Sequence, residues 1–179
     1  MSYRSIVALA TAALVSACAV APEGSAPPQF SGSIDQSAPP IVINGRGGGG
    51  IAQGREYINR MMARAYAEGR QVRLSGRFTS AGTFALFLVE NVPGSCLEPT
   101  AIFEFHRAVA VISALTVVPV PLTGSEGAEA NANIAETYNP DLSRWFLDGI
   151  KTGRITAWFT NLTGAQLGAF GYNVCEEEQ

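Results

Sequence analysis

Residues 51–68 show the clearest periodic pattern of apolar and polar positions in the chain. Apolar side chains recur there at spacings of three and four residues, which places them along one face of a helix. They are Tyr57, Met61, Met62, Ala65 and Tyr66. Gly69 follows directly, and glycine commonly ends helices because it adopts the left-handed conformation without strain. The pattern therefore predicts an amphipathic helix that ends at Glu68.

Short apolar or β-branched runs flank this helix and recur further along the chain. Residues 41–43, 72–75 and 101–105 each have the length and composition of a buried strand. A second apolar helix is expected over residues 80–91, between the second and third strands, because a Pro-Gly pair follows it closely. Strands that alternate with helices predict an α/β fold with a largely parallel sheet flanked by helices.

The C-terminal part of the chain carries a weaker pattern. Residues 140–151 predict a helix with its Trp-Phe pair turned inward. Residues 155–159 predict a strand, and residues 163–170 a final short helix. Residues 107–130 are apolar at first and then rich in glycine and alanine, and their pattern assigns no element.

The composition fits one globular domain. The chain has 179 residues, of which 47% are hydrophobic and 15% charged, and single domains commonly contain about 100–200 residues. The formal net charge is −3 and the basic residues are scattered along the chain. Nucleic-acid binding needs a concentrated basic surface, so that class of function is excluded.

The N-terminus predicts a bacterial lipoprotein export signal over residues 1–17. Arg4 supplies the positive charge, and residues 6–15 are an apolar stretch too short to span a bilayer. The tetrapeptide V-S-A-C then ends at Cys18 and matches the lipobox, in which the cysteine thiol receives the lipid. The alternative is an ordinary secretory signal that is cleaved elsewhere. With several acyl chains on Cys18, the membrane is the expected partner through this anchor.

Two further boundaries follow from this signal. Residues 18–40 are rich in Ala, Pro, Ser and Gly, so we expect a flexible linker between the lipidated cysteine and a single domain over residues 41–179. Ala19 follows the cysteine in place of aspartate, which favours the outer membrane. The expected location is the periplasm-facing side of the bacterial envelope.

Two cysteines remain once Cys18 is assigned to lipid. Export implies an oxidising compartment, in which Cys96 and Cys175 are expected to form a disulfide. The alternative is two free buried thiols. A pair of cysteines and a single histidine are too few for a zinc site, so neither a metal nor another cofactor is expected.

Three features with catalytic chemistry fall at one topological location. A glycine run over residues 45–50 follows the first strand, Ser80 lies where the second strand passes into a helix, and His106 follows the third strand. The carboxyl ends of parallel strands share an edge of the sheet, where ligands commonly bind. Histidine is the usual base that activates a serine hydroxyl. The order therefore predicts a serine hydrolase with Ser80 as nucleophile and His106 as general base.

The segment over residues 43–108 resembles the proteolytic subunit of Clp protease and its relatives in the Clp/crotonase superfamily. The motifs that carry the likeness are I-N-G-R-G-G-G-G-I-A-Q-G from residue 43, T-S-A-G-T-F from residue 79 and F-E-F-H-R-A from residue 103. The resemblance implies repeated β-β-α units with a mostly parallel sheet, and a peptide or acyl substrate. The glycine run lacks the proline that often stiffens this loop in the family.

The resemblance also implies a set of functional residues. Ser80 and His106 would act as nucleophile and base, and the backbone N–H groups of Gly48 and Ala81 would form the oxyanion hole. The family has an acidic third member well after the histidine, for which Asp141 is the first candidate and Asp148 the second. A favourable charge in the first turn of a helix is the alternative role of Asp141.

Each of these assignments has a structural alternative. The alternative role of Ser80 is a helix N-cap, and the alternative for His106 is a histidine that only ends a strand. Glu104 lies close to His106 in the sequence, but we expect strand alternation to turn it to the opposite face, so it receives no role. The function opposed to hydrolysis is a non-catalytic envelope lipoprotein that keeps the fold for partner binding or a structural role.

Overall fold

The computed structural model describes residues 30–111 and 119–176. Cys18 and residues 1–17 lie outside these ranges. The described elements, in chain order, are β1 (Ile41–Arg46), α1 (Ile51–Glu68), β2 (Val72–Thr79), the 3-10 helix η1 (Ser80–Ala85), α2 (Leu86–Asn91), β3 (Cys96–Leu97), β4 (Ile102–Phe105), β5 (Val109–Val111), β6 (Pro119–Pro121), α3 (Gly124–Ala135), α4 (Pro140–Lys151), β7 (Thr160–Thr163), α5 (Gly164–Leu167) and the 3-10 helix η2 (Gly168–Phe170).

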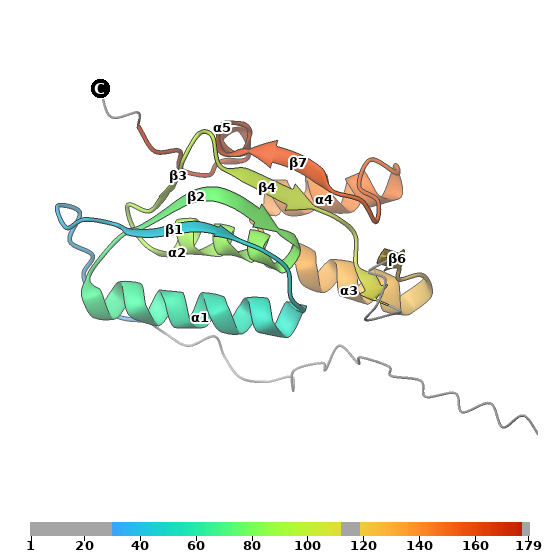
Figure 1. Ribbon diagram of the computed structural model, residues 1–179, viewed down its shortest axis with the longest axis horizontal. Coiled ribbons are helices and arrows are strands. Elements are labelled where there is room, and N and C mark those ends of the chain that lie inside the picture. The colour runs from blue at the N-terminus through green and yellow to red at the C-terminus, as the bar shows by residue number, and fades with distance from the viewer. Residues whose placement is uncertain (1–29, 112–118, 177–179) are drawn as a thin grey trace, which may run out of the picture.

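The main sheet is mixed but mostly parallel. Its strands follow the order β1-β2-β4-β7, and β3 also pairs with β2. The pairs that β2 forms with β1, β3 and β4 are parallel, whereas β7 runs antiparallel to β4. The predicted α/β class with a largely parallel sheet is therefore confirmed. Because β1, β2 and β4 lie side by side, their carboxyl ends form one edge, toward the right of Figure 1.

One face of the sheet carries the core. Helices α1 and α2 lie along that face in Figure 1, and the rings of Phe78 and Phe103 stack there at 4.8 Å. Helix α4 adds the buried side chains of Leu142 and Phe146 to the same core. On the opposite face Val42 of β1 is 56% exposed, so this face is open to solvent at β1. Burial of large apolar side chains on one face of the sheet is the main source of stability.

The local patterns of α1 and α4 are confirmed to the residue. Helix α1 spans Ile51–Glu68, and Gly69 follows it in the left-handed conformation with φ 62°. Helix α4 spans Pro140–Lys151, and the side chain of Asn139 caps it by accepting the N–H of Leu142 at 2.9 Å. The predicted second helix is confirmed as well, although its first half is the 3-10 helix η1.

The prediction of a strand over residues 155–159 is wrong. The strand in this part of the chain is β7, which begins at Thr160. Ile155 is buried because it packs against Gly149 of α4, whereas Trp158 and Phe159 are exposed. The apolar residues of this segment therefore belong to a loop. Residues 107–130, which sequence analysis left unassigned, contribute β5, β6 and part of α3.

The folded domain begins earlier than predicted. The ring of Phe30 stacks on Tyr66 at a centroid distance of 5.9 Å, and Ile34 packs against the core. The backbone N–H of Asp35 donates to the carbonyl of Gly69 at 2.7 Å. Residues 30–40, assigned to a flexible linker in the sequence analysis, therefore pack on the domain beside the end of α1.

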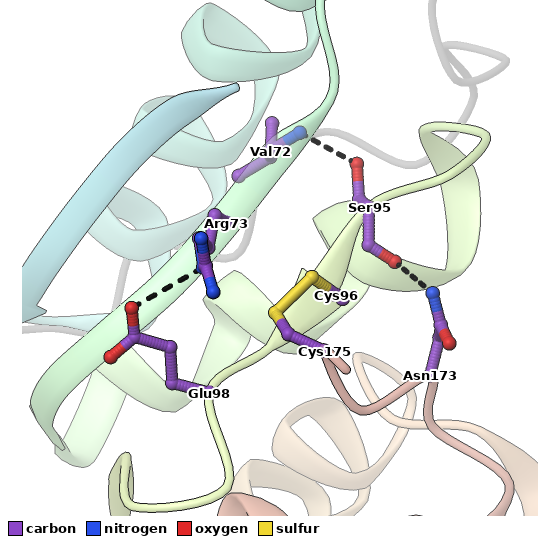
Figure 2. The surroundings of a disulfide bond; sticks show 7 residues. All are labelled: Val72, Arg73, Ser95, Cys96, Glu98, Asn173 and Cys175. Carbon is purple, nitrogen blue, oxygen red and sulfur yellow. Dashed lines mark hydrogen bonds and ion pairs between the residues drawn. A yellow bond between two sulfur atoms is a disulfide. The ribbon is translucent and has the colours of Figure 1, made fainter. Parts of the chain in front are cut away.

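The predicted Cys96–Cys175 disulfide is confirmed. It joins β3 to the C-terminal segment, as Figure 2 shows. The N–H of Cys175 also donates to the carbonyl of Leu97 at 2.8 Å, and the side chain of Asn173 donates to the carbonyl of Ser95 at 2.9 Å. Covalent and hydrogen bonds thus fix the C-terminal segment beside the sheet.

Within the described part of the chain, none of the helices combines the length and apolarity that crossing a membrane would require.

Candidate functional site

Ser80 occupies a strained turn between β2 and η1. Its φ of 55° is the one positive value at a non-glycine residue in the parts of the chain that the structure describes. The left-handed conformation costs an L-residue roughly 1–2 kcal/mol, and such strain tends to be kept at functional sites. The turn packs closely against β1 at Gly82. Only glycine fits there, because a Cβ at this position would clash with the carbonyl oxygen of Arg46.

Ser80 does not serve as the helix cap that sequence analysis offered as its alternative role. The N-cap position belongs to Thr79, and no side-chain cap hydrogen bond forms there. Within the described residues, the hydroxyl of Ser80 forms no hydrogen bond at all. The half-buried hydroxyl of Ser80 is therefore left to solvent or to a ligand.

Two consecutive hydrogen bonds, from Tyr138 to Thr83 and from Thr83 to the carbonyl of Ser80, fix the backbone of Ser80. The hydroxyl of Thr83 donates to the carbonyl of Ser80 at 2.7 Å. Its single proton is used in that bond, so Tyr138 must donate in the 2.7 Å bond between the two hydroxyls. Burial raises the pKa of Tyr138 well above its usual range, which keeps its proton in place. The relay runs from Tyr138 through Thr83 to Ser80.

His106 follows β4 and has a defined tautomer. Its Nδ1 lies 2.7 Å from the carbonyl oxygen of Arg107. A carbonyl only accepts hydrogen bonds, so Nδ1 carries the proton and Nε2 keeps a free lone pair when the ring is neutral. Burial lowers the pKa of His106, opposed in part by that hydrogen bond. The imidazole is therefore neutral near pH 7, with Nε2 available as a base.

The rim predicted from the strand order exists as one pocket. Ser80, His106 and Gly49 of the glycine run line a cavity of about 40 Å³, together with apolar side chains from α1, η1, β4 and α3. No hydrogen bond joins Ser80 to His106 among the described residues. The two side chains therefore line the same pocket without a hydrogen bond between them. Catalytic hydrogen bonds are often long in the absence of substrate.

The backbone donors differ from those expected. The N–H of Gly48 donates to the carbonyl of Thr79 at 3.1 Å, so it is not free for an oxyanion, and Gly48 is absent from the pocket lining. Gly49, in a left-handed conformation with φ 99°, and Ala81 both line the pocket. The N–H of Gly48 is therefore engaged, whereas Gly49 and Ala81 are the backbone positions that line the pocket.

Asp141 does not lie with Ser80 and His106. It is exposed in the first turn of α4, pairs with Arg144 at 3.1 Å and lines a different hollow. The chain turns at the Asn139 cap, so Tyr138 points into the pocket and Asp141 faces away. Asp148 is also exposed and pairs with Lys151 at 3.4 Å. Neither carboxylate reaches the pocket, and the group that orients His106 is the carbonyl of Arg107.

Glu104 is the site residue that sequence analysis missed. It lines the pocket, and it is 7% exposed. Its carboxylate accepts a hydrogen bond from Thr79 at 2.7 Å and pairs with Arg77. The expectation that it faces away from His106 was wrong, because residues two apart in a strand share a face. Glu104 ties the end of β4 to the end of β2, one residue before Ser80.

No family model and no curated protein matches this chain. Among the described residues, no group of three or more His, Cys, Asp or Glu side chains is placed to hold a metal ion.

Proposed function

We propose that the domain is a serine hydrolase that cleaves an ester or peptide bond, with Ser80 as nucleophile and His106 as general base. The observation that carries the proposal is the strained backbone of Ser80 at the mouth of a pocket that it shares with the only histidine of the chain. The nucleophile is thereby held on a fixed turn next to a base with a defined tautomer.

The chemistry follows from these groups. Nε2 of His106 accepts the proton of the Ser80 hydroxyl while Oγ forms a bond to the carbonyl carbon of the substrate. The N–H groups of Ala81 and Gly49 stabilise the negative charge that develops on the carbonyl oxygen. The tetrahedral intermediate then expels the leaving group, which takes the proton from His106. Water hydrolyses the acyl-enzyme by the same steps and restores Ser80.

The carbonyl of Arg107 replaces the carboxylate of a typical triad in this proposal. It holds Nδ1–H by the 2.7 Å hydrogen bond and so sets the orientation of the ring. A neutral acceptor stabilises the imidazolium less than a carboxylate does. We therefore expect a slow enzyme.

The proposed setting is the bacterial envelope, with the protein anchored through lipid on Cys18 and facing the periplasm. The export signal in the sequence and the Cys96–Cys175 disulfide support this setting. The Clp/crotonase-like arrangement of repeated β-β-α units remains part of the proposal. The parallel strands and the order glycine loop, serine and histidine along one edge support it.

A second candidate is a non-catalytic lipoprotein that keeps the fold for binding or structure. It is favoured by the engaged N–H of Gly48 and by the distance of both candidate acids from the pocket. In that case Ser80 would have no activated hydroxyl.

Labelling with a fluorophosphonate probe separates the two candidates. The probe should modify the wild type, and Ser80→Ala should abolish the modification. Ser125→Ala is the matched control because Ser125 is an exposed serine of α3 outside the pocket, and it should label like wild type. His106→Gln should slow labelling by about 100-fold or more. Equal labelling of wild type and Ser80→Ala would remove Ser80 as nucleophile and leave the binding role.

A further inference from the structure

Two adjacent aromatic side chains are exposed on the loop between α4 and β7. Trp158 is 71% exposed and Phe159 is 50% exposed. Within the described residues, Val42 on the open face of the sheet is the other large hydrophobic side chain with comparable exposure. Single exposed apolar residues are common, whereas adjacent ones that form a patch indicate a binding surface.

The patch begins where the pocket ends. The ring of Phe159 lies 5.2 Å from the imidazole of His106, at an interplanar angle of 77°. His106 lines the pocket with Ser80. Phe159 therefore borders the pocket on the side of His106.

The loop that carries the patch is fixed at several points. Ile155 is 1% exposed, and its N–H donates to the carbonyl of Gly149 at 2.9 Å. The N–H of Arg107 donates to the carbonyl of Thr156 at 2.9 Å. The N–H of Trp158 donates to the hydroxyl of Thr156 at 3.1 Å. The two aromatic rings are therefore presented by an ordered loop, which lowers the entropy cost of binding.

The size of the pocket determines what the patch can hold. A cavity of about 40 Å³ has room for a few water-sized groups, since one such group needs about 10–15 Å³ of this space. It can hold the carbonyl group and the first carbons of an acyl chain but not a medium-length chain. A longer apolar group on the acyl side would extend beyond the cavity. Phe159 offers an apolar surface beside His106, and the exposed Trp158 is its neighbour in the chain.

We propose that Trp158 and Phe159 form a subsite for the acyl chain of the substrate, so that the enzyme prefers esters of medium-length fatty acids to acetate esters. This inference rests on the proposed hydrolase function. It names the class of substrate, an apolar acyl group, and the residues that recognise it.

The test compares hydrolysis of p-nitrophenyl acetate, butyrate and octanoate. For the wild type, kcat/KM should rise about tenfold from acetate to octanoate. Trp158→Ser should reduce this octanoate-to-acetate ratio to about two. Val42→Ser is the matched control, because Val42 has similar exposure on the open face of the sheet, and it should keep the ratio of the wild type.

A fluorescence measurement gives a second readout that does not require a variant to turn over. An octyl fluorophosphonate bound to Ser80 should shift tryptophan emission to the blue, and a methyl fluorophosphonate should not. Trp158→Phe should remove the shift. The same shift on adding phosphatidylglycerol vesicles to the unlabelled protein, without an acyl preference, would assign the patch to a lipid surface and overturn the inference.

The failures of the two proposals are distinguishable. Hydrolysis of acetate and octanoate at equal kcat/KM would overturn the subsite and leave the hydrolase standing. An unchanged ratio in Trp158→Ser would do the same. Absence of both ester turnover and fluorophosphonate labelling would overturn the hydrolase and the subsite together.

Discussion

Tyr138 and Thr83 share a hydrogen bond of 2.7 Å in the buried base of the pocket, and its direction follows from what Thr83 does with its own proton. Because Thr83 donates to the carbonyl of Ser80, Tyr138 supplies the other proton. A tyrosine on the segment before α4 thereby helps to fix the turn that carries Ser80, the proposed nucleophile.

Tyr138→Phe should therefore loosen the Ser80 turn without opening a cavity. The loss of one buried hydrogen bond should lower the free energy of unfolding by about 1 kcal/mol. Fluorophosphonate labelling of Ser80 should slow several-fold because the turn is less well fixed. Urea unfolding and labelling kinetics measure both effects. Tyr57→Phe is the control, since the half-buried Tyr57 packs its ring against Arg46; an equal loss of labelling in that variant would contradict the relay.

Ser80→Gly and Ser80→Ala should differ in stability although both lack the Ser80 hydroxyl. Glycine adopts a φ of 55° without the steric cost that alanine bears. The free energy of unfolding of Ser80→Gly should therefore exceed that of Ser80→Ala by about 1 kcal/mol. Urea denaturation of the two variants makes the comparison. A less stable glycine variant would show that the backbone at this position is not strained.

His106 should titrate below pH 6.5, the usual value for histidine. Burial lowers its pKa in the folded state, so the folded protein binds this proton less readily than the unfolded chain does. The contribution to stability is complete above pH 6.5 and is lost as the pH falls through the folded-state pKa. Labelling of Ser80 should decline over the same range as the base becomes protonated.

The titration has a direct readout, because the chain contains one histidine. In a protein without a histidine tag, a single imidazole resonance reports its protonation. Its NMR midpoint should lie below 6.5, and the labelling rate should follow it. A midpoint above 6.5 would contradict the burial argument.

The Cys96–Cys175 disulfide should contribute strongly to stability. Its partners are 79 residues apart, and closing a loop of that length is worth about 4.5 kcal/mol in the chain-entropy model. Replacing both cysteines by serine should lower the free energy of unfolding by an amount of that order. Urea unfolding of the double variant tests this. A change below about 1 kcal/mol would mean that the hydrogen bonds of the C-terminal segment suffice.

Local patterns predicted the elements that local interactions determine. Helix α1 ends at its Gly69 cap, and helix α4 begins after its Asn139 cap. Both boundaries are determined by neighbouring residues in the sequence. The segment around Trp158 has the composition of a strand, but only Ile155 packs inward, against Gly149 of the preceding helix α4. Helix α3 is rich in small residues, so its apolar stripe is too weak to recognise.

The part of the site that depends on the order of strands and helices was predictable from the sequence. Ser80 and His106 line one pocket because they end neighbouring parallel strands, which the order of elements indicates. The group that orients His106 was not predictable in this way. It is the backbone carbonyl of Arg107, and every residue has such a carbonyl whatever its side chain. The place of Glu104 in the site could have been predicted from the sequence. It lies two residues before His106, and residues two apart in an extended segment point to the same side.

The contact between Phe30 and Tyr66 places the N-terminal end of the described domain at the end of α1 that lies away from the pocket. Tyr66 belongs to the last turn of α1, beside the start of β2, whereas Ser80 follows the end of the same strand. Phe30 and the pocket therefore lie at opposite ends of α1. With the proposed lipid anchor on Cys18, this separation would leave Ser80 open to substrates in the surrounding fluid.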